Sequence, residues 1–582
     1  MVLFAPLGSA RPGSVAGTGL LAATAILAAC GWAAPALAAP KGSTCAALST
    51  VSIPAKSIGL PTRGARVVAA EQVEASGSGS AAIGAYCKVT AEIAPIDTRA
   101  PSIRLIVNLP DSWNGKAAMF GGGGYDGTIP NTANTTDISY PARPKDVPIP
   151  LARGYATFSG DSGHQAPGHP LPGSEDGSFG LNDEALQNFA GDALKKTHDV
   201  ATALIEHRYS VSKIKRLYFL GGSTGGREAL AVVQRWPRDW DGVVSQYPAW
   251  NAASLDLQFG RITRAFAAPG AYPDQAKRQV LFDAAIEACD ALDGVADGVV
   301  SNVAACRSQF DPATALVHGQ PLRCPGGADT GDSCLSDAQI AALKVFDSDV
   351  TFGYPLASGE TQYPGFNLWG SDLGLDKPGN PLQPTVTLLA LGTGQPADPM
   401  PANAPFASVF WDQWVKYFVT RDPGFDSLGL DPQNPGSWAQ RISTLTGIQD
   451  VNKTDLSAFR ARGGKLILAH GTADVLVSTR ATEQYYQRLA KTMGAAKLRD
   501  FVRFYEIPGY GHAVSTVFNA AWDSLAVLEK WVEKGQPPKD LVVQDTAGVP
   551  GRTRPLCEYP TWPRYAGSGD VNLAASFACV GP

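Results

Sequence analysis

The stretch LYFLGGSTGGREAL, Leu217–Leu230, decides the fold, because an apolar run, a glycine-rich turn and a helix-forming run follow one another without a break. The pentapeptide GGSTG, residues 221–225, fits the pattern G-x-S-x-G. Between a strand and a helix, this pattern builds a sharp turn that exposes the serine oxygen above the sheet. Glycines suit such a turn because they adopt backbone angles that other residues resist. Ser223 is therefore a candidate nucleophile, if the rest of the chain supplies its partners.

Strand and helix patterns alternate on both sides of this stretch. Strands are expected at residues 103–110, 117–120, 155–164, 217–220, 242–250, 465–474 and 501–507, and helices at 192–209, 227–236, 481–493 and 521–535. Such alternation predicts an α/β fold with a largely parallel sheet that is covered by helices on both faces. From about residue 250 to residue 447 the periodicity weakens and Pro, Gly, Asn and Asp are frequent. The simplest architecture is one α/β domain, residues 39–249 and 448–582, that is interrupted by a large insertion.

Composition and charge narrow the class of protein. Across 582 residues the apolar content is 44% and the charged content 17%, which is typical of a folded soluble protein. A formal net charge of −5 without a basic run argues against nucleic acid as a partner. Downstream of the first 38 residues, no stretch has the eighteen or more uninterrupted apolar residues of a transmembrane helix. The sequence carries no signal of an oligomeric state.

The N-terminus predicts export. Arg11 supplies a positive charge, Gly19–Ala29 is an apolar core too short to span a bilayer, and residues 36–38 (ALA) offer a cleavage site after a signal peptide of residues 1–38. An alternative is a lipoprotein anchor at Cys30, which the residues LAAC (27–30) would allow. The apolar continuation after Cys30 favours the first interpretation, a secreted or periplasmic protein.

Cysteine usage agrees with an oxidising compartment. Eight cysteines remain once Cys30 is set aside, and an even set permits up to four disulfides, although the number of possible pairings is 105. No C-x-x-C motif occurs, which argues against a zinc ribbon and against thioredoxin chemistry.

A serine nucleophile needs a histidine that takes its proton and an acid that orients the histidine. In α/β-hydrolases these residues follow in the order Ser, Asp or Glu, His, each after a strand. Asp474 follows the strand pattern KLILAH, and His512 lies in PGYGHA after the last expected strand. The separation between Asp474 and His512 fits one helix and one strand, and the insertion explains the long separation from Ser223.

Other residues compete less well for these roles. His470 precedes the acid turn and is expected to hydrogen-bond locally, whereas His164 and His169 lie before the nucleophile in the wrong order. Asp161, in GDSGH, is the competing acid, and its alternative role is to hold backbone amides in a loop.

Ester or amide hydrolysis also needs donors for the oxyanion. One expected donor is the backbone N–H of Thr224, directly after the nucleophile. The other is expected in the loop FGGGGYDG, residues 120–127, which follows a strand. The alternative role for four consecutive glycines is a flexible hinge.

A second cluster is CDALDGVADGVVSN, residues 289–302. Asp290, Asp293 and Asp297 place three carboxylates within eight residues, which is costly without a cation. Hard oxygen ligands at this spacing suit Ca²⁺. A solvated acidic loop explains the spacing equally well.

Together these residues resemble the tannase and feruloyl esterase family, which includes bacterial hydrolases of mono(2-hydroxyethyl) terephthalate. The resemblance covers most of the mature chain through GGSTGGREAL, CDALDGVADGVV, GGKLILAHGTAD, PGYGH and TRPLCEYPTWPRYAGSGDVNLAASFAC. It implies an α/β-hydrolase core with a large inserted lid domain of residues 250–447. It also implies the triad Ser223, Asp474 and His512 and oxyanion donors at the backbones of Gly122 and Thr224.

The same resemblance implies a structural Ca²⁺ and a disulfide pattern. The metal would be bound by Asp290, Asp293 and Asp297 and by the carbonyls of Val295 and Val299. The implied disulfides are Cys45–Cys87, Cys289–Cys306, Cys324–Cys334 and Cys557–Cys579.

One departure from the family pattern concerns a further disulfide, between cysteines directly before the nucleophile and directly after the histidine. Here these positions are Gly222 and Ala513. Neither sulfur takes part in proton transfer, so the chemistry is expected to survive. A more mobile histidine loop is the predicted consequence.

The predicted function is a secreted serine esterase that acts through an acyl-enzyme on esters of aromatic acids, of feruloyl, galloyl or terephthaloyl type. The alternatives are a secreted serine peptidase and a non-catalytic binding protein on a hydrolase scaffold. Lid aromatics are expected to cover the acyl ring, with one or two of the following in contact: Trp369, Phe410, Trp411, Trp414, Tyr417 and Phe418.

Overall fold

The structure is a computed structural model that describes residues 42–134, 143–166 and 174–582. The predicted signal peptide, its cleavage site and Cys30 lie outside these residues, as does His169, so nothing further is said of their structure.

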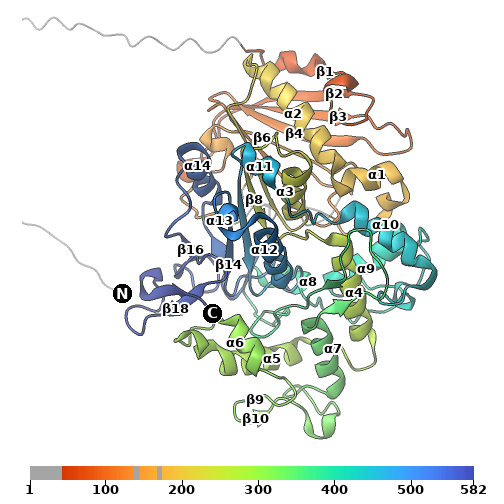
Figure 1. Cartoon of the computed structure of the whole chain (residues 1–582), viewed down its shortest axis with the longest axis vertical. Coiled ribbons are helices and arrows are strands. Elements are labelled where there is room, and N and C mark those ends of the chain that lie inside the picture. The colour runs from red at the N-terminus through yellow and green to blue at the C-terminus, as the bar shows by residue number, and fades with distance from the viewer. Residues whose placement is uncertain (1–41, 135–142, 167–173) are drawn as a thin grey trace, which may run out of the picture. The chain divides into compact units, whose positions relative to one another are not determined.

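Within the described residues, ten strands form one sheet in the order β1-β2-β3-β4-β6-β5-β7-β8-β13-β14 (Figure 1). The strands from β6 to β14 run parallel to one another, as the alternating pattern predicts. Their bounds are β1 Ser52–Ile53, β2 Ala65–Val73, β3 Tyr86–Ile93, β4 Ile103–Pro110, β5 Lys116–Phe120, β6 Ala156–Gly160, β7 Arg216–Gly222, β8 Gly242–Gln246, β13 Lys465–Gly471 and β14 Val502–Ile507.

The sheet begins with an antiparallel part that the sequence analysis did not predict. Strands β1 to β4 pair antiparallel, and β4 also pairs antiparallel with β6. Most side chains of β2 are exposed or only partly buried, so the strand lacks the apolar run by which buried strands are recognised.

Helices cover both faces of the sheet. Successive side chains of β7 point to opposite faces and so pack against different helices. Leu217 and Phe219 pack in the cluster that includes α2 (Ala193–Tyr209) and α3 (Thr224–Arg235). Tyr218 and Leu220 pack in the opposite cluster, with Leu528 and Trp531 of α14. The remaining helices are α1 Asp183–Gln187, α4 Ala252–Ala267, α5 Gln275–Cys289, α6 Val303–Gln309, α7 Asp337–Asp347, α8 Gln383–Leu389, α9 Phe406–Gln413, α10 Ala439–Gln449, α11 Ser457–Ala461, α12 Thr479–Met493, α13 Ala495–Arg499 and α14 Ser524–Lys534.

The inserted segment leaves the sheet after β8 and returns before β13, and these two strands are direct neighbours. It contains α4 to α11 and two small two-stranded sheets, β9 (Leu316–Val317) with β10 (Gln320–Pro321) and β11 (Val350–Thr351) with β12 (Gln362–Tyr363). Near the C-terminus lie a three-stranded and a two-stranded sheet, formed by β15 Ala520–Ala521, β16 Val542–Asp545, β17 Thr553–Pro555, β18 Trp562–Tyr565 and β19 Phe577–Val580.

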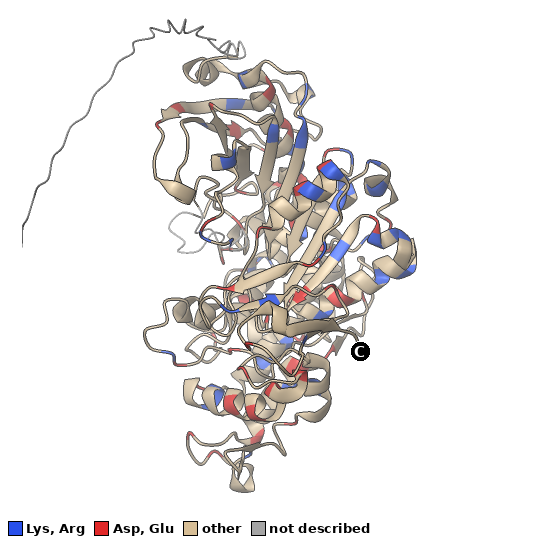
Figure 2. Cartoon of the chain, turned by 90° about the vertical axis from the view of Figure 1, so that its left-hand side faces the viewer, with Lys and Arg blue, Asp and Glu red and all other residues tan. Residues whose placement is uncertain are grey.

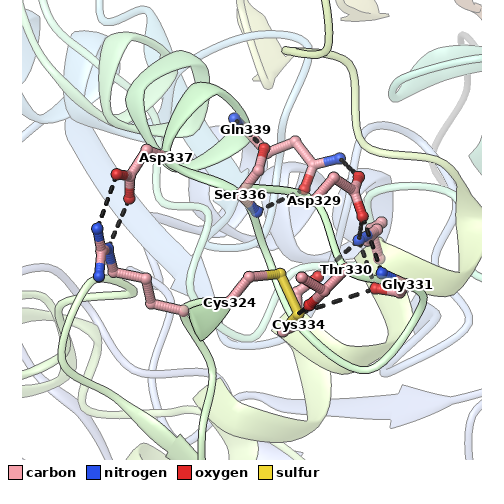
Figure 3. Close-up of a disulfide and its surroundings, with 10 residues drawn as sticks. Cys324, Asp329, Thr330, Gly331, Cys334, Ser336, Asp337 and Gln339 are labelled. Atoms are coloured by element: carbon pink, nitrogen blue, oxygen red, sulfur yellow. Dashed lines mark hydrogen bonds and ion pairs between the residues drawn. A yellow bond between two sulfur atoms is a disulfide. The ribbon is translucent and has the colours of Figure 1, made fainter. Parts of the chain in front are cut away.

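All four disulfides that the resemblance implies are present. Cys45–Cys87 ties the first described turn to β3, Cys289–Cys306 closes the acidic loop, and Cys557–Cys579 closes the C-terminal region. Figure 3 shows the fourth, Cys324–Cys334, beside a polar network in which Gln339 contacts both Ser336 and Asp329. Cross-links between distant segments restrict the unfolded chain and so stabilise the fold.

Charged residues of both signs are interspersed along the elements that face the viewer in Figure 2. Among the described residues, no helix is both long enough and apolar enough to cross a membrane.

Candidate active site

Ser223 occupies the turn between β7 and α3 in a strained conformation, with φ of 60° and ψ of −124°. Its backbone N–H donates to the carbonyl of Gln246 at 3.1 Å, which fixes the turn against β8. A side chain at Gly221 would lie 2.2 Å from the carbonyl oxygen of Gly225, so glycine is required where strand and helix meet. These features are those of a nucleophile elbow.

His512 and Asp474 converge on this serine. The Nε2 atom of His512 lies 2.9 Å from the Oγ atom of Ser223, and its Nδ1 atom lies 2.8 Å from Oδ2 of Asp474. Asp474 follows β13 and is fully buried, and His512 follows β14 and is 6% exposed. Of the three residues that the sequence order predicts as a triad, His512 therefore lies within hydrogen-bond distance of both Ser223 and Asp474.

The surroundings of Asp474 keep it ionised. Its Oδ1 atom accepts the backbone N–H groups of Leu476 and Val477 at 2.9 and 2.8 Å. Burial opposes ionisation, but the interactions with His512 and His470 outweigh it, and they hold the pKa of Asp474 below its ordinary value. Because a carboxylate only accepts, the proton of His512 stays on Nδ1 and leaves Nε2 free to accept from Ser223.

His470 contributes to this arrangement more than the sequence analysis expected. Its Nδ1 atom contacts the hydroxyl of Thr482 at 2.8 Å, and its Nε2 atom lies 3.2 Å from Oδ2 of Asp474 and 3.0 Å from the carbonyl of Val477. The side chain is fully buried, so it is a fixed second donor to the carboxylate. Its position four residues before Asp474 was the only available signal in the sequence.

Gly122 is the residue of the glycine loop whose backbone the resemblance implies as an oxyanion donor. Its N–H donates to Oε2 of Glu228 at 3.0 Å, so this donor is already used. The glycine of this loop that lines the cavity together with Ser223 and Thr224 is Gly124. The hydroxyl of Thr224 donates to the carbonyl of Gly124 at 2.6 Å and ties the loop to the elbow. The sequence alone does not indicate which of the four consecutive glycines, residues 121–124, turns its N–H toward the cavity.

A buried acid pair holds the glycine loop in place. Asp126 and Glu228 are 1% and 3% exposed, and burial raises the pKa of both carboxyl groups. The negative charge of Glu228 raises the pKa of Asp126 further. Side chains added at Gly121 or Gly122 would each approach this pair to 2.7 Å, so the loop packs directly on it.

A narrow, mostly apolar cavity opens beside Ser223. Its volume is about 490 Å³, which includes space that is open to solvent. Of the six lid aromatics expected at the acyl ring, only Phe410 is among the described residues that line it; Trp411 and Trp414 are fully buried in the core. The sequence analysis missed the other apolar lining residues, which are Tyr125, Phe189, Leu255, Phe259, Phe406, Leu476 and Val477.

Tyr247 fills the space at Gly222, where the family pattern places a cysteine. A side chain at position 222 would lie 2.4 Å from the Tyr247 hydroxyl oxygen and 2.5 Å from its ring. The Tyr247 ring meets the His512 imidazole edge to face, with centroids 4.9 Å apart. The neighbouring Tyr510 donates its hydroxyl to the carbonyl of Ala513 at 2.6 Å. Aromatic packing and this hydrogen bond therefore support the histidine loop.

This packing predicts that a disulfide between positions 222 and 513 forms only when Tyr247 is made small. In the variant Gly222→Cys/Ala513→Cys the new Cβ atom overlaps the tyrosine ring, so a fall in kcat and in melting temperature is expected, of the size that overpacking produces. Adding Tyr247→Ala should relieve the overlap and allow the disulfide to form, although the ring that packs on His512 is then lost. Free-thiol titration measures disulfide formation in the two variants, and thermal unfolding measures their melting temperatures. Disulfide formation with unchanged stability while Tyr247 is present would contradict this account.

The acidic loop places its three aspartates around a short turn after α5. Asp290 accepts backbone N–H groups from Asp297, Gly298 and Val299, and Asp297 forms an ion pair with Arg554. Oδ2 of Asp293 is buried and has no hydrogen-bond partner among the described residues. That oxygen and the chemistry of the donor set fit a hard cation. The described side chains do not, however, form a preassembled cluster of three acidic, His or Cys ligands.

The competing residues have structural roles. Oδ1 of Asp161 accepts the backbone N–H groups of Arg104 and Gly163, both at 3.0 Å, which is the alternative role expected for it. His164 is buried and stacks on Phe179 with centroids 3.7 Å apart, and burial lowers its pKa to about 4.

Comparisons with known proteins show which family this chain is similar to. The chain is 39% identical over 557 residues to an uncharacterized esterase of Agrobacterium fabrum, covering 94% of this chain and 95% of that protein. It is 32% identical over 543 residues to the mono(2-hydroxyethyl) terephthalate hydrolase of Piscinibacter sakaiensis, covering 86% of both chains.

Solved structures share the fold. Feruloyl esterase B from Aspergillus oryzae superposes with a TM-score of 0.70 at 23% identity, over 90% of this chain and 98% of that one. Tannin acyl hydrolase from Aspergillus niger superposes with a TM-score of 0.63 at 21% identity, over 92% and 96%. The family model for tannase and feruloyl esterase matches residues 87–580. The chain therefore belongs to the tannase and feruloyl esterase family.

Proposed function

We propose that this chain is an exported serine esterase that hydrolyses aromatic esters through an acyl-enzyme on Ser223. Membership of the family makes it a carboxylic ester hydrolase that acts on small aromatic esters. The observation that carries the finer proposal is the continuous hydrogen-bond chain from Ser223 through His512 to Asp474.

In the first half of the reaction, Oγ of Ser223 attacks the ester carbonyl carbon and its proton passes to Nε2 of His512. The tetrahedral intermediate carries negative charge on the former carbonyl oxygen. As it collapses, His512 gives the proton to the leaving alkoxide, and the alcohol departs. The acyl group is then esterified to Ser223.

In the second half, a water molecule loses a proton to Nε2 of His512 and attacks the acyl carbon. Collapse of this second intermediate returns the proton to Oγ of Ser223 and releases the acid. Asp474 stabilises the imidazolium in both halves and keeps the proton of Nδ1 in place.

The proposed oxyanion donors are the backbone N–H groups of Thr224 and Gly124. Thr224 is the residue after Ser223, and Gly124 lines the same cavity as Ser223 and Thr224. Fixed backbone donors cost no reorganisation when charge develops, which is why they stabilise the transition state effectively.

We also propose that the acidic loop binds a structural Ca²⁺ through Asp290, Asp293 and Asp297 and the carbonyls of Val295 and Val299. The ion would neutralise carboxylates that lie close together, and it supplies no step of the reaction. Export through the predicted signal peptide is supported by the four disulfides, which persist in oxidising compartments.

The calcium proposal predicts a metal-dependent stability. Chelation with EGTA should lower the melting temperature by at least about 3 °C, because a ligand that binds only the folded state stabilises it. Asp293→Asn should abolish both the effect of EGTA and Tb³⁺ luminescence sensitised by nearby aromatics. If neither Tb³⁺ nor EGTA has any effect on the wild type, Arg554 alone balances the charge of the loop and the proposal is wrong.

The test of the proposed function compares substrate classes with one enzyme preparation. Aryl carboxylic esters and peptide amides are assayed side by side, together with labelling by a fluorophosphonate. Hydrolysis of the esters with labelling is the expected result. Hydrolysis of the peptides alone would indicate a peptidase, and neither labelling nor turnover would indicate a binding protein on a hydrolase scaffold.

A further inference from the structure

His512 lies in the histidine loop, residues 508–519, which connects β14 to β15 and whose backbone is strained. The next residue, Ala513, has φ of 62°, a left-handed conformation that a residue with a Cβ atom adopts at a cost. Such a conformation persists only where surrounding contacts hold it. The Tyr510 hydroxyl supplies one contact from within the loop, and neither position 222 nor position 513 carries a cysteine. A further support from another part of the chain is therefore expected.

The inserted segment provides such a support through two charged side chains. The hydroxyl of Thr516, in the histidine loop, donates to Oδ2 of Asp372. Nζ of Lys377 donates to the same hydroxyl oxygen at 3.1 Å and lies 3.7 Å from Oδ2 of Asp372. Asp372 and Thr516 are each only 6% exposed, so their hydrogen bond is shielded from water. One hydroxyl of the histidine loop is thus held between the carboxyl group and the ammonium group of the inserted segment.

Asp372 is itself fixed by its neighbours. Its Oδ1 atom accepts the backbone N–H groups of Gly374 and Leu375, both at 2.8 Å. The side-chain amide of Gln383, the first residue of α8, donates to the same oxygen at 3.4 Å. A side chain whose orientation is set by several hydrogen bonds can hold a partner in a defined place. Asp372 is therefore suited to anchor the histidine loop.

Asp372 and His512 line the same cavity, between the inserted segment and the histidine loop. Its volume is about 310 Å³, which includes space that is open to solvent. Gly511 belongs to the wall that the histidine loop forms, and Val386 and Leu389 belong to the wall that α8 forms. Because space remains between the two walls, close packing alone does not fix their separation. The hydrogen bond between Asp372 and Thr516 joins them directly.

The same part of the inserted segment also contacts the loop that carries Asp474. Nδ2 of Asn367 donates to the carbonyl of Thr472 at 3.2 Å, and the hydroxyl of Ser478 donates to the carbonyl of Gly365 at 2.6 Å. Thr472 and Ser478 lie two residues before and four residues after Asp474. The inserted segment therefore fixes the loop of the acid and the loop of the histidine relative to each other.

We infer that Asp372 is a positioning residue, which holds the histidine loop through the hydroxyl of Thr516 and so keeps His512 within reach of Ser223. Nε2 of His512 lies 2.9 Å from Oγ of Ser223, and proton transfer requires such a distance. In this chain the contact ties the histidine loop to the inserted segment, where the family pattern ties it to the serine turn. The inference rests on the proposed function, because it concerns how His512 is held for that reaction.

The variant Thr516→Val tests the inference, because it removes the hydroxyl and changes the volume little. With methyl benzoate as substrate, kcat is expected to fall about ten- to hundredfold, since a displaced base transfers protons slowly. KM should stay within about twofold, because the residues that line the cavity beside Ser223 are unchanged. The rate at which a fluorophosphonate labels Ser223 should fall with kcat. Thr516→Ser keeps the hydroxyl and should restore both rates.

The matched control is Thr62→Val. Thr62 is 7% exposed, and its hydroxyl donates to the carbonyl of Ala94 at 2.6 Å, beside the antiparallel strands β2 and β3. This variant also loses one buried hydrogen bond, so its melting temperature should fall as that of Thr516→Val does. Its kcat and its labelling rate should equal those of the wild type. The pair therefore separates loss of positioning from loss of stability.

A double-variant cycle tests whether Asp372 acts through Thr516. Asp372→Ala should lower kcat at least as much as Thr516→Val does. If both changes break one contact, Asp372→Ala/Thr516→Val should lose no more kcat than Asp372→Ala alone, because the losses of coupled residues do not add. Thermal unfolding shows whether each variant is folded. Should Asp372→Ala fail to fold, the comparison of Thr516→Val with Thr516→Ser decides the inference.

The inference is overturned if Thr516→Val keeps the kcat and the labelling rate of the wild type, or if Thr62→Val loses as much of both. It is also overturned if the separate losses of kcat multiply in the double variant. Absence of ester hydrolysis and of fluorophosphonate labelling in the wild type would instead overturn the proposed function. The two failures therefore differ in their readouts.

Discussion

The variant Ser223→Ala is expected to lose about 10⁴- to 10⁶-fold in kcat for aryl esters, because removal of the attacking hydroxyl leaves only the oxyanion donors and substrate binding. Alanine still fits the turn only under strain, since φ at position 223 is 60°. The melting temperature must therefore be measured alongside the rate, so that loss of chemistry is separated from loss of fold.

A matched control for this variant is Ser336→Ala. Ser336 caps α7 in the inserted segment, where its hydroxyl accepts the N–H of Gln339. Its removal should cost about 1 kcal/mol of stability and leave kcat close to that of the wild type. Residual ester hydrolysis by Ser223→Ala at more than about one hundredth of the wild-type rate would argue for another nucleophile.

The second large effect concerns Asp474. In Asp474→Asn the amide can present N–H groups to His512, which favours the imidazole tautomer with its proton on Nε2. That tautomer cannot accept from Ser223, and kcat is expected to fall about 10⁴-fold. Hydrogen bonds from Leu476, Val477 and His470 hold the side chain of Asp474, so its position should change little.

Asp161→Asn serves as the comparison for Asp474, because Asp161 is the other buried acid that follows a strand and precedes a histidine. Its carboxylate holds backbone amides, so kcat should stay near the wild-type value. A large loss of kcat in Asp161→Asn together with a small loss in Asp474→Asn would contradict this account, because it would identify Asp161 as the acid that supports the histidine.

Asp474 also links stability to pH. Its pKa is held below that of the unfolded chain, so its ionised form contributes stability at neutral pH, and this contribution is lost as pH falls below about 4. The difference in stability between wild type and Asp474→Asn should accordingly shrink in acid. A difference that stays constant down to pH 3 would contradict this electrostatic account.

The parallel strands and the places of Ser223, Asp474 and His512 after strands could be predicted from the sequence because both depend on local patterns. The buried strands β7 and β13 are largely apolar runs, and Ser223 and Asp474 each follow one of them, whereas His512 follows β14, in which apolar and charged residues are mixed. Strand order then brings the three together, since β7, β8, β13 and β14 are successive neighbours in the sheet.

Other features depend on contacts between distant segments and could not be predicted. Whether Gly122 or Gly124 faces the cavity depends on Glu228, which reaches back from α3 to the glycine loop. Nothing near Gly222 in the sequence indicated that Tyr247 occupies the space where a side chain at position 222 would lie.

The central claim is that the acyl group of the substrate is bonded to Ser223 during turnover. Rapid acid quenching of the enzyme with an aryl ester, followed by peptide mass spectrometry, measures this directly. The account predicts an added acyl mass on the peptide that contains Ser223, and its absence in Ser223→Ala. Turnover of the ester with the acyl mass on another residue would contradict it.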